Sequence, residues 1–213
     1  MFQNNIKEIH GGDYIKNNIV IAIIIGLVVS NIYFISQYHT QKRIAEDFHS
    51  RNIHKATDVF YSTTRQLDNI YNSILKGESV ERQLLILADL SSSLSTSEES
   101  FSFLQVYLKQ SMPRNLHDSM AEISRFFSDI NLYVSGQVRG YVAGDETITQ
   151  EEILYHIETF NKGIEYLIAN LNVDIFYEGN YEEVKNHWKI LAREIITQFP
   201  DNSVFNHYGE WWF

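Results

Sequence analysis

The fold of this chain is decided by one stretch near its N-terminus, Ile19–Ile35, which reads IVIAIIIGLVVSNIYFI. No Asp, Glu, Lys or Arg occurs between Lys16 and Lys42, so the stretch is apolar on every face of a helix. A helix of 17 residues is about 26 Å long, close to the roughly 30 Å thickness of the hydrocarbon in a bilayer. We therefore predict a transmembrane signal-anchor helix over residues 18–38, preceded by a short N-terminal tail, residues 1–17.

Two other interpretations of this stretch remain open. A cleaved signal peptide would have Lys7 and Lys16 in its basic region, and Val28-x-Ser30 would be the motif recognised at its cleavage site. A core helix of a globular domain would carry a polar face, which this stretch lacks. We favour the uncleaved anchor, because the apolar run resumes after Asn31 and passes into a helical pattern without a breaker.

The side of the membrane is not set by charge, since basic residues flank the predicted span at both ends. Lys7 and Lys16 precede it, and Lys42, Arg43 and Arg51 follow it, so the comparison of positive charge gives a tie. When only a short tail precedes a signal-anchor, the commoner arrangement leaves that tail in the cytoplasm and places the rest of the chain outside. We therefore expect a single-pass protein of the cell membrane whose bulk domain is extracytoplasmic.

Composition restricts what the domain behind the anchor can do. The net charge is −10, and the charges of residues 1–36 cancel, so the whole deficit lies in the remainder of the chain. An acidic domain repels phosphate backbones, which argues against nucleic-acid binding. The chain has no cysteine, which excludes disulfides, thiolate metal sites and a cysteine nucleophile.

Apolar residues recur at helical spacing after the anchor. Ile53, Phe60, Leu67 and Ile74 lie seven residues apart, the seam that a helix buries against its neighbours or against a second copy of the chain. This helix is expected to end near Lys76. The sequence therefore predicts an all-α fold, in which the transmembrane helix continues into an antiparallel up-and-down helical bundle of about four to six helices over residues 39–199.

Further helix starts divide the rest of that domain. They are expected at Ser79, at Pro113, at Thr149 with Glu152 in a capping box, and at Asn180. The serine-rich segment 91–97 either kinks one helix or separates two. Residues 173–177, VDIFY, could form a short extended piece.

Histidines are the first candidates for chemistry. Glu152 with His156, and Glu183 with His187, are i,i+4 pairs that could build a metal site in a bundle. The carboxylate-bridged di-iron motif needs glutamate and histidine at i,i+3, which is absent, and both glutamates also fit capping boxes. No nucleophile elbow or HExxH motif occurs, so we expect no enzyme activity, no catalytic residue, no bound metal and no cofactor.

Two other features could bear function. Gly136, Gly140 and Gly144 are spaced four apart, which favours close helix packing. The C-terminal tail, residues 200–213, is rich in aromatic side chains that are costly to leave in water. It is expected to pack on the bundle, to lie at the membrane interface or to dock a partner, with Phe205, Tyr208, Trp211, Trp212 and Phe213 as the docking residues.

These features predict a membrane-anchored, non-enzymatic accessory or interaction protein of the cell envelope. Its expected partners are the membrane and a protein, either another chain or a second copy of this one. A ligand-sensing bundle that signals through a partner is one alternative, and a bundle-type metalloprotein is another.

Overall fold

A computed structural model describes residues 4–110, 119–178 and 181–212 of the chain. The described residues are almost entirely helical, and no strand occurs among them. The chain divides into two units, Met1–Asp47 and Phe48–Phe213. The predicted all-α fold is therefore confirmed, while the predicted starts at Pro113 and Asn180 lie outside the described residues.

The first unit consists of the N-terminal part of helix α1, which spans Asn4–Leu75 in all. This part of the helix is long and apolar enough to cross a membrane, and no residue of its apolar window is buried in the protein. From Asn18 to Ile44 every residue is exposed. The prediction of one N-terminal helix with the length and composition of a transmembrane span is confirmed.

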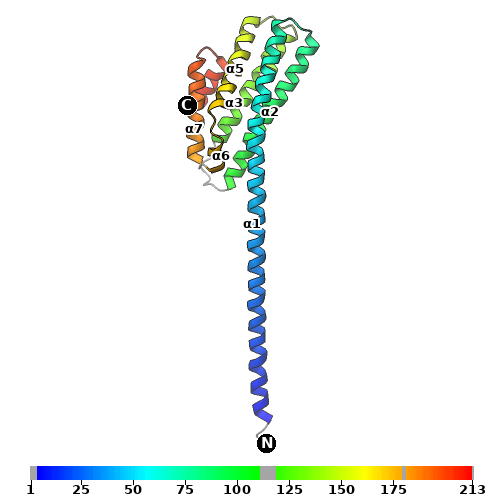
Figure 1. The fold of residues 1–213 in the computed structure, drawn as a ribbon, viewed down its shortest axis with the longest axis vertical. Helices are drawn as coiled ribbons and strands as arrows, with labels where there is room; N and C mark the ends of the chain where they lie inside the picture. The colour runs from blue at the N-terminus through cyan, green and yellow to red at the C-terminus, as the bar shows by residue number, and fades with distance from the viewer. Residues whose placement is uncertain (1–3, 111–118, 179–180, 213) are drawn as a thin grey trace. The chain divides into compact units, whose positions relative to one another are not determined.

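The second unit contains the C-terminal part of α1 and the remaining helices, which lie side by side in Figure 1. The π-helix η1 joins α3 directly to α4, so that one helical rod runs from α3 to α4. The elements after α1 are α2 (Val80–Gln110), α3 (Ser119–Tyr133), η1 (Val134–Val138), α4 (Arg139–Val142), α5 (Gln150–Asn170), α6 (Asp174–Glu178), α7 (Tyr181–Gln198) and α8 (Ser203–Trp212).

The core of the second unit is aromatic. Phe60 of α1 stacks on Phe127 of α3 with ring centroids 5.1 Å apart, and Phe101 of α2 stacks on both. Aromatic rings bury large areas, so this stack supplies much of the apolar contact between three helices. The seven-residue seam of α1 contributes to the same core, since all four of its members are at least 96% buried: Ile53, Phe60, Leu67 and Ile74.

Hydrogen bonds between side chains show that α2 and α3 run in opposite directions. Ser102 and Ser124 share a hydrogen bond of 2.9 Å, while Ser91 donates to Asn131 over 2.8 Å, so α2 and α3 are antiparallel. The turn between α1 and α2 closes at Gly77, whose φ of 62° is the left-handed conformation that glycine adopts without strain.

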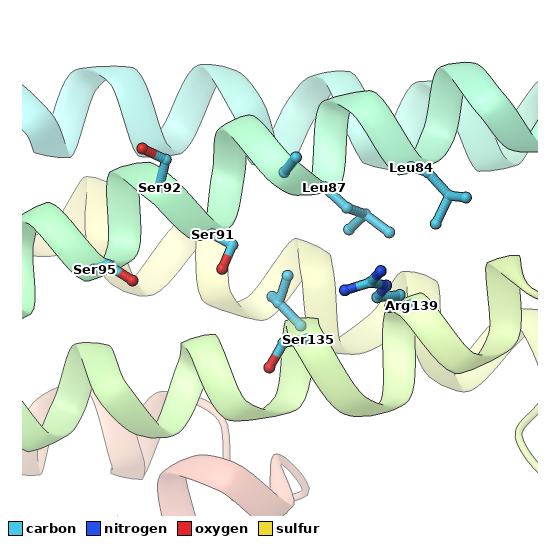
Figure 2. Close-up of a pocket in the computed structure, with 9 residues that line it drawn as sticks. Leu84, Leu87, Ser91, Ser92, Ser95, Ser135 and Arg139 are labelled. Carbon is cyan, nitrogen blue, oxygen red and sulfur yellow. The ribbon is translucent and has the colours of Figure 1, made fainter.

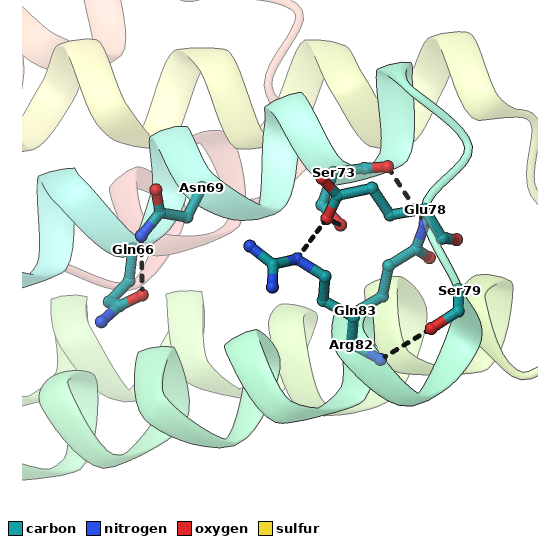
Figure 3. Close-up of polar contacts among 7 residues, drawn as sticks. All are labelled: Gln66, Asn69, Ser73, Glu78, Ser79, Arg82 and Gln83. Carbon is teal, nitrogen blue, oxygen red and sulfur yellow. Dashed lines mark hydrogen bonds and ion pairs between the residues drawn. The ribbon is translucent and has the colours of Figure 1, made fainter.

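A polar network secures that turn between α1 and α2 (Figure 3). Glu78 Oε2 accepts hydrogen bonds from Ser73 Oγ at 2.8 Å and from Arg82 Nε at 2.6 Å. Gln83 Nε2 donates to the carbonyl of Ser73 at 3.2 Å, and Ser79 Oγ accepts from the backbone N–H of Arg82. These bonds satisfy groups that the ends of two helices would otherwise leave without partners.

The serine-rich segment belongs to one helix, α2, and forms no second start. Thr96, Ser97 and Ser100 each donate a hydroxyl proton to the carbonyl four residues earlier. Because these hydroxyls bond to carbonyls within α2, the helix continues through the segment from Val80 to Gln110. At residue 149, by contrast, the predicted cap is confirmed, because Thr149 Oγ1 accepts from Glu152 N at 3.2 Å.

The extended piece expected at residues 173–177 is wrong, because Asp174–Glu178 forms the short helix α6. Asn172 Oδ1 accepts from the backbone N–H of Asp174, a local bond that starts a helical turn. The turn buries Phe176 against Phe101, with ring centroids 6.1 Å apart. A core contact therefore decides the conformation of this segment.

Gly163 of α5 lies where three helices meet, and it provides a test of how tightly they pack. A Cβ added there would lie 3.0 Å from Phe205 Cζ and 3.3 Å from Ile195 Cγ2. Both neighbours are fully buried and have no room to retreat. We expect Gly163→Ala to lower the free energy of unfolding by about 1–3 kcal/mol in thermal or urea unfolding of the full chain in detergent.

Gly136→Ala is the matched control, since a Cβ at Gly136 meets no atom within 4 Å. It should leave stability unchanged or raise it by up to about 1 kcal/mol through helix propensity. Equal stability of the two variants would contradict the close packing of α5 against α7 and α8.

Candidate functional site

The aromatic tail forms a helix, α8, with one buried and one exposed face. Phe205 and Tyr208 are at least 99% buried, and Phe205 stacks on Phe126 with centroids 5.6 Å apart. Tyr208 Oη donates to the carbonyl of Glu122 at 2.9 Å and accepts from Trp188 Nε1 at 2.8 Å. Two of the five predicted docking residues therefore lie in the core of the second unit, where they secure α8 to α3 and α7.

The exposed face of α8 carries Trp211, which is 73% exposed. Trp211 borders a surface cavity of about 320 Å³ together with His207 and the ion pair between Arg125 and Asp129. The Arg125 Nε to Asp129 Oδ1 distance is 2.6 Å, and burial nevertheless raises the pKa of Asp129. The side chain of Trp212 and the whole of Phe213 lie outside the described residues.

The three predicted packing glycines have open surroundings. A Cβ at Gly136 or Gly144 would meet nothing within 4 Å, and at Gly140 the nearest atom is Oδ2 of Asp145 at 3.7 Å. Gly144 has a φ of 99° and follows the end of α4, so it acts as a turn residue there. Close approach of helices occurs instead at Gly163.

The two predicted histidines lie in different surroundings. His156 is 96% buried with its ring 4.5 Å from that of Tyr133, and its Nδ1 is buried without a hydrogen-bond partner. His187 Nε2 accepts from the backbone N–H of Asn172 at 3.0 Å. Burial lowers the pKa of both histidines. Within the described ranges, no group of three or more His, Asp or Glu side chains is arranged to hold a metal ion.

A groove with apolar and polar lining residues lies between α2 and the rod of α3, η1 and α4 (Figure 2). Its volume is about 370 Å³, within the range of small-molecule pockets. In Figure 2, Leu84, Leu87 and Ser91 extend from α2 toward the opposite rod, and Arg139 extends back along the groove. The full lining is Leu84, Leu87, Ala88, Ser91, Ser92, Ser95, Val134, Ser135 and Arg139.

Asn131 organises the hydroxyl groups at one end of this groove. Ser91 Oγ donates to Asn131 Oδ1 at 2.8 Å, and Asn131 Nδ2 donates to Ser95 Oγ at 3.1 Å. Ser135 Oγ donates to the carbonyl of Asn131 at 2.7 Å. Ser95 Oγ therefore accepts one hydrogen bond, and among the described residues it donates none, so its own hydroxyl proton remains available.

The π-helix η1 sets the direction of the groove's other wall. Val134, Val138 and Val142 are all buried, although they lie four residues apart. Four residues of α-helix rotate by about 40° beyond one full turn, so repeated spacings of four would drift off one face. The wider turn of η1 compensates for that drift and keeps the valines in the core. Arg139, the first residue of α4, is thereby placed at the groove.

Sequence reasoning missed this groove. From the sequence, the serine-rich segment 91–97 suggests only a kink or a break in a helix, and Arg139 carries no functional expectation. The one sequence signal is the repeated spacing of four from Ile130 through Val134 and Val138 to Val142. A π turn keeps residues at this spacing on one face of a helix, and π turns are frequent at functional sites.

Comparison with protein-family models, with curated proteins and with solved structures finds no match to this chain. The groove, the exposed apolar segment of α1 and the exposed face of α8 therefore carry the functional argument.

Burial of His156 predicts a stability that depends on pH. In the folded state its pKa lies below the ordinary value of 6.5, so the unfolded chain binds the proton more tightly. Stability is then full above pH 6.5 and is lost as the pH falls through 6.5 toward the folded-state pKa. We expect the unfolding temperature of the full chain to drop between pH 7.5 and 5, with His187 contributing in the same direction.

His156→Gln should reduce that dependence, whereas His207→Gln on the exposed face of α8 should leave it intact. An unchanged pH profile in His156→Gln would show that His156 does not resist protonation in the folded state.

Proposed function

We propose that this chain is a single-pass membrane protein whose apolar segment, Ile19–Ile35, anchors an acidic, antiparallel up-and-down helical bundle on the extracytoplasmic side. In this proposal the protein acts as a non-enzymatic accessory or interaction protein of the cell envelope. The observation that carries it is the exposure of the whole apolar window of α1.

The energy of that exposed surface supports an anchor. Transfer of a Val, Leu, Ile or Phe side chain out of water contributes about 1.5–3 kcal/mol. Within Ile19–Ile35, every residue is exposed. A bilayer removes every face of such a helix from water, whereas a single protein partner would cover only one face.

A double charge substitution tests the anchor. Ile24→Lys with Val28→Lys places two charges in the middle of the segment, each costing about 2.5–3.5 kcal/mol on membrane-insertion scales. We expect the wild-type chain to stay in the membrane pellet after alkaline carbonate extraction and the double variant to be released.

Ile190→Lys with Leu75→Lys is the control, because both residues are more than half exposed on the second unit. It should stay in the pellet. Release of the wild-type chain would contradict the anchor, and a mature chain beginning at Asn31 would show a cleaved signal peptide instead.

The exposed face of α8 supports the interaction part of the proposal. Trp211 lies beside a charged pair, Arg125 and Asp129, so that a large aromatic surface and polar groups are offered together. Tryptophan and arginine are enriched among residues that dominate binding energy at interfaces. We therefore propose Trp211, with Trp212 and Phe213 beyond it, as the contact with a protein partner or a second copy of the chain.

Photo-crosslinking separates this contact from the structural part of the tail. A benzoylphenylalanine in place of Trp211 should give a crosslinked adduct in native membranes, whereas the same group in place of Tyr61, also more than half exposed, should not. Trp211→Ala should change the free energy of unfolding by less than about 0.5 kcal/mol, and Phe205→Ala should lower it by about 3–5 kcal/mol. Equal adducts at both positions, or none, would contradict the contact.

A second candidate function, sensing of a small ligand with signalling through a partner, is favoured by the groove between α2 and η1. That groove combines a cavity of suitable volume, an apolar wall and a cation.

A further inference from the structure

The charge of the groove is opposite to that of the protein. Arg139 is the one charged side chain among the described residues that line it, whereas the whole chain carries a net charge of −10. In the part of the chain that the structure describes, no carboxylate forms an ion pair with Arg139. Its guanidinium is therefore available to a ligand, and guanidinium binds carboxylates through paired hydrogen bonds.

The wall next to Arg139 is apolar. Leu84 and Leu87 line the cavity there, and Figure 2 shows both on the side that faces Arg139. Such side chains stabilise a ligand's carbon skeleton by removing it from water. An inorganic anion would make no use of this wall, so the lining favours an organic anion.

The far end of the groove is polar again. Ser91 and Ser95 are held by Asn131, and Ser95 keeps a hydroxyl proton for donation. The apolar wall thus ends at Ser91, about two turns of α2 beyond Leu84, which is roughly 10 Å of helix. A tail of a few carbon atoms fits this length.

The lining also discriminates against zwitterions. An amino acid would bring an ammonium group, whose burial needs an anionic or carbonyl partner. The described lining contains no Asp or Glu. A ligand with one negative charge and no positive charge matches the groups present.

We propose that the groove between α2 and η1 binds a small monocarboxylate with an apolar tail, with its carboxylate on Arg139 and its carbon chain along Leu84 and Leu87. The π-helix η1 is part of the site, since it turns Arg139 toward the groove while Val134 and Val138 stay in the core. This inference rests on the second candidate function and is independent of the membrane anchor.

Titration calorimetry on the full chain in detergent micelles, with empty micelles as the blank, tests the proposal. The probes are acetate, butyrate and hexanoate. We expect affinity to rise along the series by about two- to fourfold per added CH2 group, because each methylene leaves water for the leucine wall. Butyramide, which keeps the shape without the charge, and 2-aminobutyrate, which adds an ammonium, should each bind at least tenfold more weakly than butyrate.

Two variants localise the binding. Arg139→Gln should weaken hexanoate about 10- to 100-fold, the loss expected for a charge-assisted hydrogen bond. Arg65→Gln, which removes an exposed cation from α1 outside the groove, should bind like the wild type. Near-ultraviolet circular dichroism of both variants checks that the fold is unchanged.

Absence of heat for every carboxylate would overturn the proposal, as would wild-type affinity in Arg139→Gln. Inorganic phosphate or 2-aminobutyrate binding as tightly as hexanoate would overturn the assignment of a monocarboxylate. Binding is measured here without reference to the membrane or a partner, so its failure is distinct from a failure of carbonate extraction or crosslinking.

Discussion

The second unit depends on the stack of Phe60, Phe101 and Phe127, which joins α1, α2 and α3 at one level. The ring centroids are 5.1 to 6.0 Å apart and the interplanar angles are 3 to 26°. Each ring therefore contacts the other two, and one cluster connects all three helices. Phe126, the neighbour of Phe127, faces α7 and α8 through Trp188 and Phe205. Phe127 therefore packs against α1 and α2, while the adjacent Phe126 packs against α7 and α8.

This arrangement explains why the C-terminal helix is integral to the domain. Tyr208 brings its hydroxyl into an apolar interior, where burial raises its pKa and an unmet hydroxyl would be costly. Its bonds to Trp188 and to the carbonyl of Glu122 satisfy that group and determine the position of α8. With one face committed in this way, the opposite face is left to present Trp211 to solvent.

The groove arises from the same packing. The rod of α3, η1 and α4 must keep Val134, Val138 and Val142 in the core, and a regular α-helix would rotate them away. The π turn solves this problem and brings Arg139 beside Leu84 and Leu87. Burial of the three valines therefore also places a cationic side chain, Arg139, in a groove of a protein whose net charge is −10.

Much of the fold could be read from the sequence, because its signals are local. The uninterrupted apolar run at Ile19–Ile35, the seven-residue seam from Ile53 to Ile74 and the cap at Thr149 each depend on residues within a few turns of one another. The segment 173–177 was predicted wrongly, since burial of Phe176 against Phe101 outweighs its preference for an extended strand.

The candidate site was out of reach for a related reason. Ser91, Ser95, Arg139 and Asn131 come from segments up to 48 residues apart in the sequence, and no spacing rule connects them. Likewise, the sequence determined that the tail is too aromatic to stay in water, but not which of its rings are buried. Only the tertiary structure decided that Phe205 and Tyr208 enter the core and Trp211 does not, because the cavity between α3 and α7 accepts one face of α8.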